Sequence, residues 1–311
     1  MAYIKNVEIR NFKSIKNIEF SAKKVNVFIG DVNTGKSNIL EAIALPVSLE
    51  EKEITDAPRI TYIFYNQDLE YEIKIKLENS EGRILNYRMI SNDVYINDSE
   101  YKLTAEYNRG YSGYIHSKSE EIKPLLDDFP IKFYKFYKAG RVDYTFDYIH
   151  LILLKNKEIA KLFKEILENY NLTLAFNYTD YGCRVEIYKK TDDLNAPITF
   201  NLLSKNLMKF IFYLIAIRTN SNSIIILDDI NLYPVHSKLI GETIALDETN
   251  QFFISTSDAY LLNSLVEKTN KNDLSVFNVY YDKKNDETKI KQIDVDDILR
   301  IGAFNIFFNL D

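Results

Sequence analysis

The sequence predicts an α/β protein in which helices flank a mixed central sheet, with an antiparallel β lobe in the N-terminal half. Three observations lead to this class. A glycine-rich loop at residues 30–37 lies between a short apolar run and a segment with helical spacing. A second apolar run, residues 223–227, ends in two carboxylates and is typical of a buried parallel strand. Between these runs, alternating apolar and polar residues predict antiparallel strands.

Composition bounds the class of protein. The chain has 311 residues, with 46% hydrophobic and 27% charged residues, as in globular proteins that function in water. A net charge of −6 gives no overall attraction to nucleic acid. The single cysteine, Cys183, excludes an intrachain disulfide and a cysteine zinc cluster. No apolar run reaches the roughly 18–20 residues of a membrane span, and the N-terminus is not a signal peptide. We therefore expect a cytoplasmic protein that does not enter membranes, with one domain over residues 1–311 and a β-rich insertion lobe at about residues 59–138.

The N-terminal segment predicts two strands. Apolar residues recur at about every second or third position between residues 3 and 20. We expect an antiparallel hairpin there, which leads into a strand at residues 25–29 and then into the glycine-rich loop.

The loop has the pattern G-x-x-x-x-G-K-S of a phosphate-binding loop, with Gly30 and Gly35 at the two glycine positions. The glycines let the backbone wrap tightly and direct its N–H groups inward. The helix that follows adds the positive end of its dipole. Lys36 is expected to reach the β- and γ-phosphates of ATP, and the Ser37 hydroxyl to bind Mg²⁺.

Two stretches resemble the ABC-type ATPases of the SMC, RecF and OLD kind. Those proteins open with a strand ending in N-F-K-S-I, which matches residues 11–15 here. They then reach a loop of the form G-P-N-G-S-G-K-S-N-I-L-E-A-I, whose second half matches residues 35–43 closely. The resemblance implies a P-loop ABC-type ATPase head. The ATP-binding residues that it implies in this loop are Gly30, Asp31, Asn33, Thr34, Gly35, Lys36, Ser37 and Asn38.

The lobe begins with two alternating runs, residues 60–65 and 69–77, which predict a hairpin around residues 66–68. Gln67 lies in this turn. It is either the glutamine that senses Mg²⁺ in ABC-type ATPases or a turn residue, and we favour the turn. A second turn is predicted at residues 79–82.

The run 131–138 alternates basic and apolar residues and predicts a strand. The pattern predicts that its lysines share one face, which is either a strip facing DNA or a solvated edge, and we favour the edge. Helical spacing over residues 147–170 and two strands at residues 172–178 and 184–189 follow. The sequence lacks the long heptad run that SMC-type proteins carry between the two halves of the ATP site.

The segment 203–209 occupies the place of the family's signature, L-S-x-G-x-x-K. Ser204 and Lys209 match the serine and the lysine, whereas Asn206 replaces the glycine. The resemblance implies that Ser204 and Asn206 bind the γ-phosphate held by a second subunit. The alternative is that Ser204 only caps the helix that follows.

The buried strand at residues 223–227 ends in Asp228 and Asp229, at the Walker B position. Asp228 is expected to hold Mg²⁺. The resemblance gives Asp229 the position of the catalytic glutamate, although its side chain is one methylene shorter. If reach limits the rate, Asp229→Glu is expected to hydrolyse ATP at least as fast as wild type. The alternative is that the loop at residues 230–231 is adapted to aspartate.

The strand at residues 250–258 resembles the family's Q-x-x-x-T-T-H-S, with Ser257 in place of the histidine. A serine can hydrogen-bond a phosphate oxygen but carries no charge. The resemblance thus names Lys36, Asp229 and Ser257 as catalytic. Two strands at residues 275–281 and 288–293 and a helix with carboxylates at its N-terminus are predicted to follow. We expect no toprim nuclease of the kind found in OLD proteins.

The resemblance implies a nucleotide-dependent homodimer with ATP and Mg²⁺ at its interface. With Asn206, Asp229 and Ser257 all deviating, we expect a slowly hydrolysing ATP switch that controls an effector protein or DNA. The alternative is a nucleotide-binding regulatory or structural module with no useful turnover. A third hypothesis is a protein that binds DNA directly.

Overall fold

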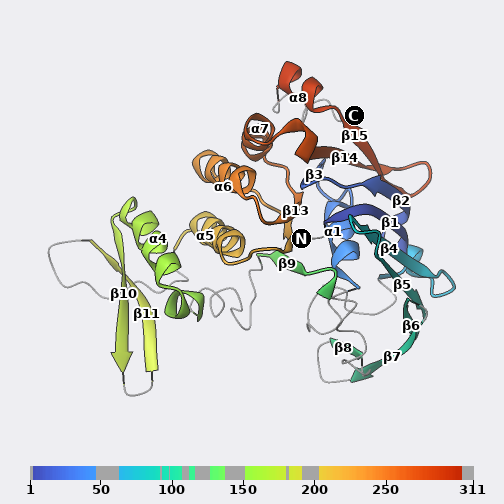
Figure 1. Cartoon of the computed structure of the whole chain (residues 1–311), viewed down its shortest axis with the longest axis horizontal. Coiled ribbons are helices and arrows are strands. Elements are labelled where there is room, and N and C mark those ends of the chain that lie inside the picture. Colours follow the sequence, from blue (N-terminus) through green and yellow to red (C-terminus); the bar gives the residue numbers. More distant parts are fainter. Residues whose placement is uncertain are drawn as a thin grey trace. The chain divides into compact units, whose positions relative to one another are not determined.

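The computed structural model describes residues 3–46, 63–91, 93–97, 99–106, 112–115, 127–136, 151–179, 182–190 and 203–302. The chain divides into two compact units. The first combines Met1–Lys135 with Ser221–Asp311, and the second is Phe136–Asn220. Figure 1 shows the helices and strands of both. The division into compact units does not test the single domain expected over residues 1–311, which stays a prediction.

A seven-stranded antiparallel sheet forms the β lobe of the first unit, in the order β2-β1-β4-β5-β6-β7-β8. Alternation of buried and exposed positions in β1 and β4 places one face on the core. The predicted entry hairpin is confirmed, because β1 and β2 pair antiparallel with Val7 opposite Phe20. The strands are β1 (Ile4–Phe12), β2 (Ile15–Ser21), β4 (Ile73–Asn79), β5 (Ile84–Ile90), β6 (Asp93–Ile96), β7 (Ser99–Glu106) and β8 (Ser112–Ile115).

The hairpin expected around residues 66–68 is wrong. Phe64 forms an isolated bridge with Phe12, and Tyr65–Gln67 is a 3-10 turn in which Asn66 and Gln67 have positive φ. The strand that follows is β4, which pairs with β1 and β5 instead. Residues 60–62 lie outside the described residues. Gln67 is exposed in this turn, as its interpretation as a turn residue predicted.

The second sheet of this unit is mixed and has six strands in the order β15-β14-β3-β13-β12-β9. It includes the strand predicted before the phosphate loop, β3, and the strand predicted to end at Asp228, β12. All neighbours pair in parallel except β14 and β15. Strands β3, β12 and β13 are buried at every position, so both faces of the sheet are covered. The strands are β3 (Val25–Ile29), β9 (Ile131–Lys135), β12 (Ile224–Asp228), β13 (Gln251–Ser255), β14 (Leu274–Asp282) and β15 (Glu287–Ile293).

Helix α1 (Lys36–Ala44) joins the two sheets of this unit. It contacts β1 and β4 of the antiparallel sheet and β9, β12 and β13 of the mixed sheet. Figure 1 shows α6 (Pro234–Leu246), α7 (Ala259–Lys268) and α8 (Val295–Ile301) on the other side of the mixed sheet. A 3-10 turn, Lys271–Asp273, precedes β14. The carboxylates predicted at the last helix are confirmed as the cap Asp294 and two acids in the first turn.

Among the described residues, the second unit contains a helical stretch at residues 151–155, helix α4 (Lys157–Glu168), the hairpin strands β10 (Leu172–Thr179) and β11 (Gly182–Lys189), and helix α5 (Lys205–Arg218). The predicted helical span 147–170 is interrupted at Asn156, which adopts extended backbone and caps α4 with its side chain, while residues 151–155 before it are also helical. Residues 147–150 lie outside the described residues. Within the part of the chain that the structure describes, we found no helix with the length and apolar character of a membrane span.

Candidate functional site

The phosphate-binding pattern forms a loop between β3 and α1, at the carboxyl edge of the mixed sheet. Gly30 has a φ of 148° and Gly35 a φ of 100°, both in the region that favours glycine. A Cβ atom at Gly30 would lie 2.1 Å from the Val279 carbonyl oxygen, and one at Gly35 would lie 2.2 Å from Thr288 Oγ1. Both glycines are therefore required by backbone conformation and by close packing against β14 and β15.

Lys36 folds back over this loop. Its Nζ donates hydrogen bonds to the carbonyl oxygens of Gly30 at 2.7 Å and Asp31 at 2.6 Å. Desolvation lowers the pKa of Lys36, while the nearby carboxylates of Asp229, Asp31 and Asp228 act in the opposite direction. The ammonium thus already lies where the loop backbone converges, as a phosphate-binding lysine requires.

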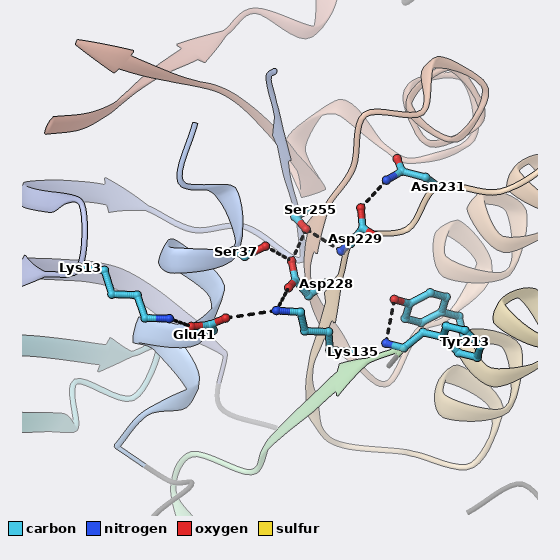
Figure 2. A network of polar contacts seen from close by, with 10 residues as sticks. Lys13, Ser37, Glu41, Lys135, Tyr213, Asp228, Asp229, Asn231 and Ser255 are labelled. Carbon is cyan, nitrogen blue, oxygen red and sulfur yellow. Dashed lines mark hydrogen bonds and ion pairs between the residues drawn. The ribbon is translucent and has the colours of Figure 1, made fainter. Parts of the chain in front are cut away.

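Asp228 is the centre of the polar network drawn in Figure 2. It ends β12, is fully buried, and accepts hydrogen bonds at Oδ1 from Ser37 at 2.9 Å and from Ser255 at 2.5 Å. Its Oδ2 forms an ion pair with Lys135 Nζ at 3.3 Å. Three elements therefore position this carboxylate: α1 through Ser37, β13 through Ser255 and β9 through Lys135.

The oxygen atoms of Ser37 and Asp228 fit a Mg²⁺ ion. Both are hard oxygen donors, and they lie within hydrogen-bond distance of each other beside the phosphate loop. Among the residues that the structure describes, no group of three or more His, Cys, Asp or Glu side chains could form a complete metal cage. A small number of protein ligands is typical of Mg²⁺, because one or two side chains usually hold it together with phosphate oxygens and water.

Asp229 differs from its neighbour in exposure and in its side-chain contacts. It is exposed and has a φ of 60°, a left-handed conformation that aspartate tolerates better than most residues. Its N–H donates to Ser255 Oγ at 2.7 Å, and its Oδ1 accepts a hydrogen bond from Asn231 Nδ2. Asn231 also accepts the N–H of Ser257 at 2.8 Å, so it links the ends of β12 and β13.

The remaining loop residues have more varied positions. Ser257 is exposed, and its Oγ donates to the Gly30 carbonyl oxygen at 3.3 Å, which places it beside the phosphate loop. Asn33 is also exposed and has a φ of 63°. Thr34 Oγ1 donates to the Asp31 carbonyl oxygen at 2.9 Å and stiffens the loop from within.

Asn38 does not point at the phosphate site. Its Nδ2 donates to Ser14 Oγ at 2.7 Å, and Ser14 lies 2.7 Å from Thr288 Oγ1. The side chain instead ties α1 to the turn between β1 and β2. Ser14 belongs to the N-F-K-S-I phrase, so that phrase supports the loop from outside.

The two signature residues lie in the second unit. Ser204 is the N-cap of α5, where its Oγ accepts the N–H of Leu207 at 3.2 Å. Asn206 lies in the first turn of α5, and it is not among the residues with positive φ. Asparagine tolerates a left-handed backbone better than most residues, as glycine does. Asn206 does not adopt that conformation here.

Sequence reasoning missed several residues of the network in Figure 2, among them Ser255, Lys135 and Glu41. Ser255 was within reach, because it lies near the end of the strand predicted within residues 250–258, and the structure pairs that strand in parallel with the one that ends at Asp228. The lysines of β9 were placed on one face, which is wrong: Lys132 is exposed, whereas Lys135 has only 19% of its side chain exposed. Residues three apart on a strand point to opposite faces.

Comparison with known proteins identifies the fold. Neither a protein-family model nor a curated protein matches the chain. The chain is similar to the solved structure of an SMC head bound to the C-winged helix domain of ScpA, with 16% identity and a TM-score of 0.60, over 95% of this chain and 99% of that one. It is also similar to an SMC head domain from Thermotoga maritima, with 13% identity and a TM-score of 0.47, over 93% of this chain and 98% of that one.

The first of these likenesses extends over nearly all of both chains, although the sequences have diverged far. The predicted class, an α/β protein with a phosphate loop, a mixed sheet flanked by helices and an antiparallel lobe, is confirmed. The chain has the fold of an SMC-type ABC ATPase head.

Proposed function

We propose that this protein is an ATP-binding switch that requires Mg²⁺ and hydrolyses ATP slowly. The observation that carries the proposal is the junction of Ser37, at the start of α1, with the buried carboxylate of Asp228, next to a glycine loop with its lysine in place. On an SMC-type head fold, these groups have the chemistry needed to bind a nucleoside triphosphate and its metal ion.

Each group of residues has a distinct role in this proposal. Backbone N–H groups from Gly30 to Ser37 and the N-terminus of α1 bind the β- and γ-phosphates, and Lys36 contributes its charge. Ser37 and Asp228 hold Mg²⁺, which neutralises charge on the phosphates. Asp229 is the candidate base for the attacking water, and Ser257 a hydrogen-bond donor to the γ-phosphate.

We extend the proposal to assembly. Ser204 and Asn206 lie at the N-terminus of α5, where backbone N–H groups attract phosphate. As the family resemblance implies, they would bind the ATP of a second copy, so that nucleotide drives formation of a homodimer. The similar SMC head was solved with a domain of ScpA bound. By analogy, an effector protein is the first partner to seek, and DNA the second.

A module without useful turnover is the second candidate function. The placement of Asp229 favours it: the side chain is exposed and its Oδ1 accepts a hydrogen bond from Asn231. A carboxylate held in this way has to leave that contact, or share it, before it can accept a proton from water.

The test combines three measurements on the wild-type protein. Calorimetry with ATP and MgCl₂ measures binding, light scattering with and without nucleotide measures mass, and phosphate release measures turnover. We expect binding, a mass that doubles with ATP, and slow phosphate release. Binding and dimerisation without phosphate release would favour the regulatory module, and absence of binding would exclude both functions.

A further inference from the structure

Lys135 occupies a position that the functions above do not use. It ends β9, which pairs in parallel with β12 so that Lys135 and Asp228 are directly matched in register. Its Nζ lies 3.3 Å from Asp228 Oδ2, on the side of the carboxylate opposite to the oxygen that accepts from Ser37. A lysine thus contacts the carboxylate that is proposed to hold the metal.

The same ammonium has a second partner. Glu41 Oε1 lies 3.3 Å from Lys135 Nζ, and Glu41 is only 2% exposed. Glu41 follows Ser37 by one helical turn of α1, so both side chains face the end of β12. The other Glu41 oxygen, Oε2, pairs with Lys13. Figure 2 shows the resulting row of alternating charges, Lys13–Glu41–Lys135–Asp228.

This arrangement makes Lys135 and a metal ion share one carboxylate. Two cations close to the same oxygen pair repel each other strongly in a partly buried site. Lysine is a point charge on a flexible stem, so its ammonium can shift between two acceptors without a backbone movement. Because Glu41 lies as near to Nζ as Asp228 does, it can keep the ammonium paired when a metal takes Asp228.

Resting on the proposed ATP-binding function, we propose that Lys135 is a built-in counter-ion of Asp228 that reduces the dependence of nucleotide binding on Mg²⁺. Glu41 is the acceptor that receives the ammonium when the metal binds. Lys135 is therefore a positioning residue that sets the metal requirement, and it is not assigned a chemical step.

The experiment measures a metal ratio, defined as the dissociation constant for ATP in EDTA divided by that in MgCl₂. In Lys135→Met, Asp228 and Glu41 lose their shared cation and repel the phosphates unless Mg²⁺ replaces it. We expect the metal ratio of this variant to rise at least about fivefold over wild type, the lower end of typical coupling between two ligands. Lys135→Arg keeps the charge, and we expect it to restore most of the wild-type ratio.

Two further variants separate this role from a general effect of charge or folding. Lys13→Met removes the same charge from the same row without touching Asp228, and its ratio should stay within about twofold of wild type. Glu41→Gln removes the negative charge of the second acceptor, so the ammonium favours Asp228 more strongly and the ratio should fall. A purely structural disturbance would not move Lys135→Met and Glu41→Gln in opposite directions.

The outcomes are distinguishable. If wild type does not bind ATP in MgCl₂, the proposed function fails. If wild type binds and Lys135→Met keeps the wild-type ratio, or rises no more than Lys13→Met, only the counter-ion proposal fails. If Lys135→Met does not fold, Glu41→Gln decides: a ratio equal to or above that of wild type overturns the proposal.

Discussion

The two consecutive carboxylates at the end of β12 form an inner and an outer region of the same site. The inner region, around Asp228, is fully buried and is held from α1, β13 and β9. The outer region, around Asp229, is exposed, and Asn231 of the same loop contributes its side-chain contact. One position along the chain changes a carboxylate fixed by three elements into one at the surface of a loop.

This difference indicates how the site separates binding from turnover. Groups proposed to bind phosphate and metal are fixed by secondary structure before any ligand arrives, which reduces the cost of ordering them on binding. The group proposed to activate water depends on a short loop, where a shift of about 1 Å can change a rate by up to roughly a hundredfold. Changes in the inner region should therefore alter affinity and stability, and changes in the outer region should alter turnover.

The largest effect is expected for Lys36→Ala. The variant loses the charge that reaches the phosphates and two hydrogen bonds inside the loop. We expect ATP affinity in MgCl₂ to fall by about a hundredfold, about 2.7 kcal/mol, measured by calorimetry. The melting temperature should change by less than about 3 °C, because Lys36 is the first residue of α1 and its side chain is not part of the hydrophobic core.

The matched control is Lys132→Ala, which removes an exposed lysine of β9 and so changes the net charge by the same amount. Its affinity for ATP should equal that of wild type. Tight ATP binding by Lys36→Ala would remove the phosphate-loop assignment.

The next largest effect is the contrast between Asp228→Asn and Asp229→Asn. Neutralising Asp228 leaves Lys135 with one carboxylate fewer and removes a metal ligand, so both stability and Mg²⁺-dependent binding should drop. We expect a loss of about 3 kcal/mol in unfolding free energy, near the low end for a broken buried pair. Asp229→Asn should keep both properties and lose turnover.

Urea unfolding and ATP binding measured on both variants check this contrast. Equal losses of stability would mean that the inner and outer regions do not differ as their burial indicates. A larger loss of binding in Asp229→Asn would mean that the metal ligand is Asp229 and not Asp228.

The sequence predicted the parts of the site that follow from local patterns. The loop at residues 30–37 and the strand ending at Asp228 have short-range signatures, because a tight phosphate loop and a buried strand each impose residue types on a few consecutive positions. Contacts across the sheet carry no such signature. Lys135 meets Asp228 only through the parallel pairing of β9 and β12, which alternation within residues 131–138 does not encode.

The failed hairpin at residues 60–77 has the same cause. Alternation indicates that a segment is extended, but it does not name the strand with which the segment pairs. Phe64 pairs with Phe12, and β4 pairs with β1, because the N-terminal strand offers both a partner and a core to cover. The conformation of Asp229 was also beyond local patterns, since its positive φ is stabilised by hydrogen bonds to Ser255 and Asn231.

The third prediction concerns Asp229→Glu and tests whether the outer loop is adapted to aspartate. Sequence reasoning favoured a gain in turnover from the longer side chain. The structure favours the alternative, because glutamate tolerates a φ of 60° less well than aspartate and would displace the contact with Asn231. We now expect phosphate release to slow by roughly tenfold, with ATP affinity unchanged.

Asn231→Ala is the companion variant, because it frees Asp229 Oδ1 from the amide while leaving the carboxylate itself. If the contact with Asn231 positions Asp229 for the reaction, Asn231→Ala also slows phosphate release, whereas faster release would mean that the contact only keeps the carboxylate from the water. Faster phosphate release by Asp229→Glu would indicate instead that the short side chain of aspartate limits turnover.

The smallest effect is the pH dependence contributed by His236, which lies in the first turns of α6, directly after the outer loop. Burial lowers the pKa of His236 below its ordinary value of 6.5, so the unfolded chain binds a proton more readily than the folded one. Between the lowered pKa and 6.5, the free energy of unfolding therefore falls as the pH falls. We expect His236→Gln to lose less stability than wild type between pH 7.5 and pH 5 in urea unfolding. Equal losses in wild type and His236→Gln would mean that acid weakens the fold at groups other than His236.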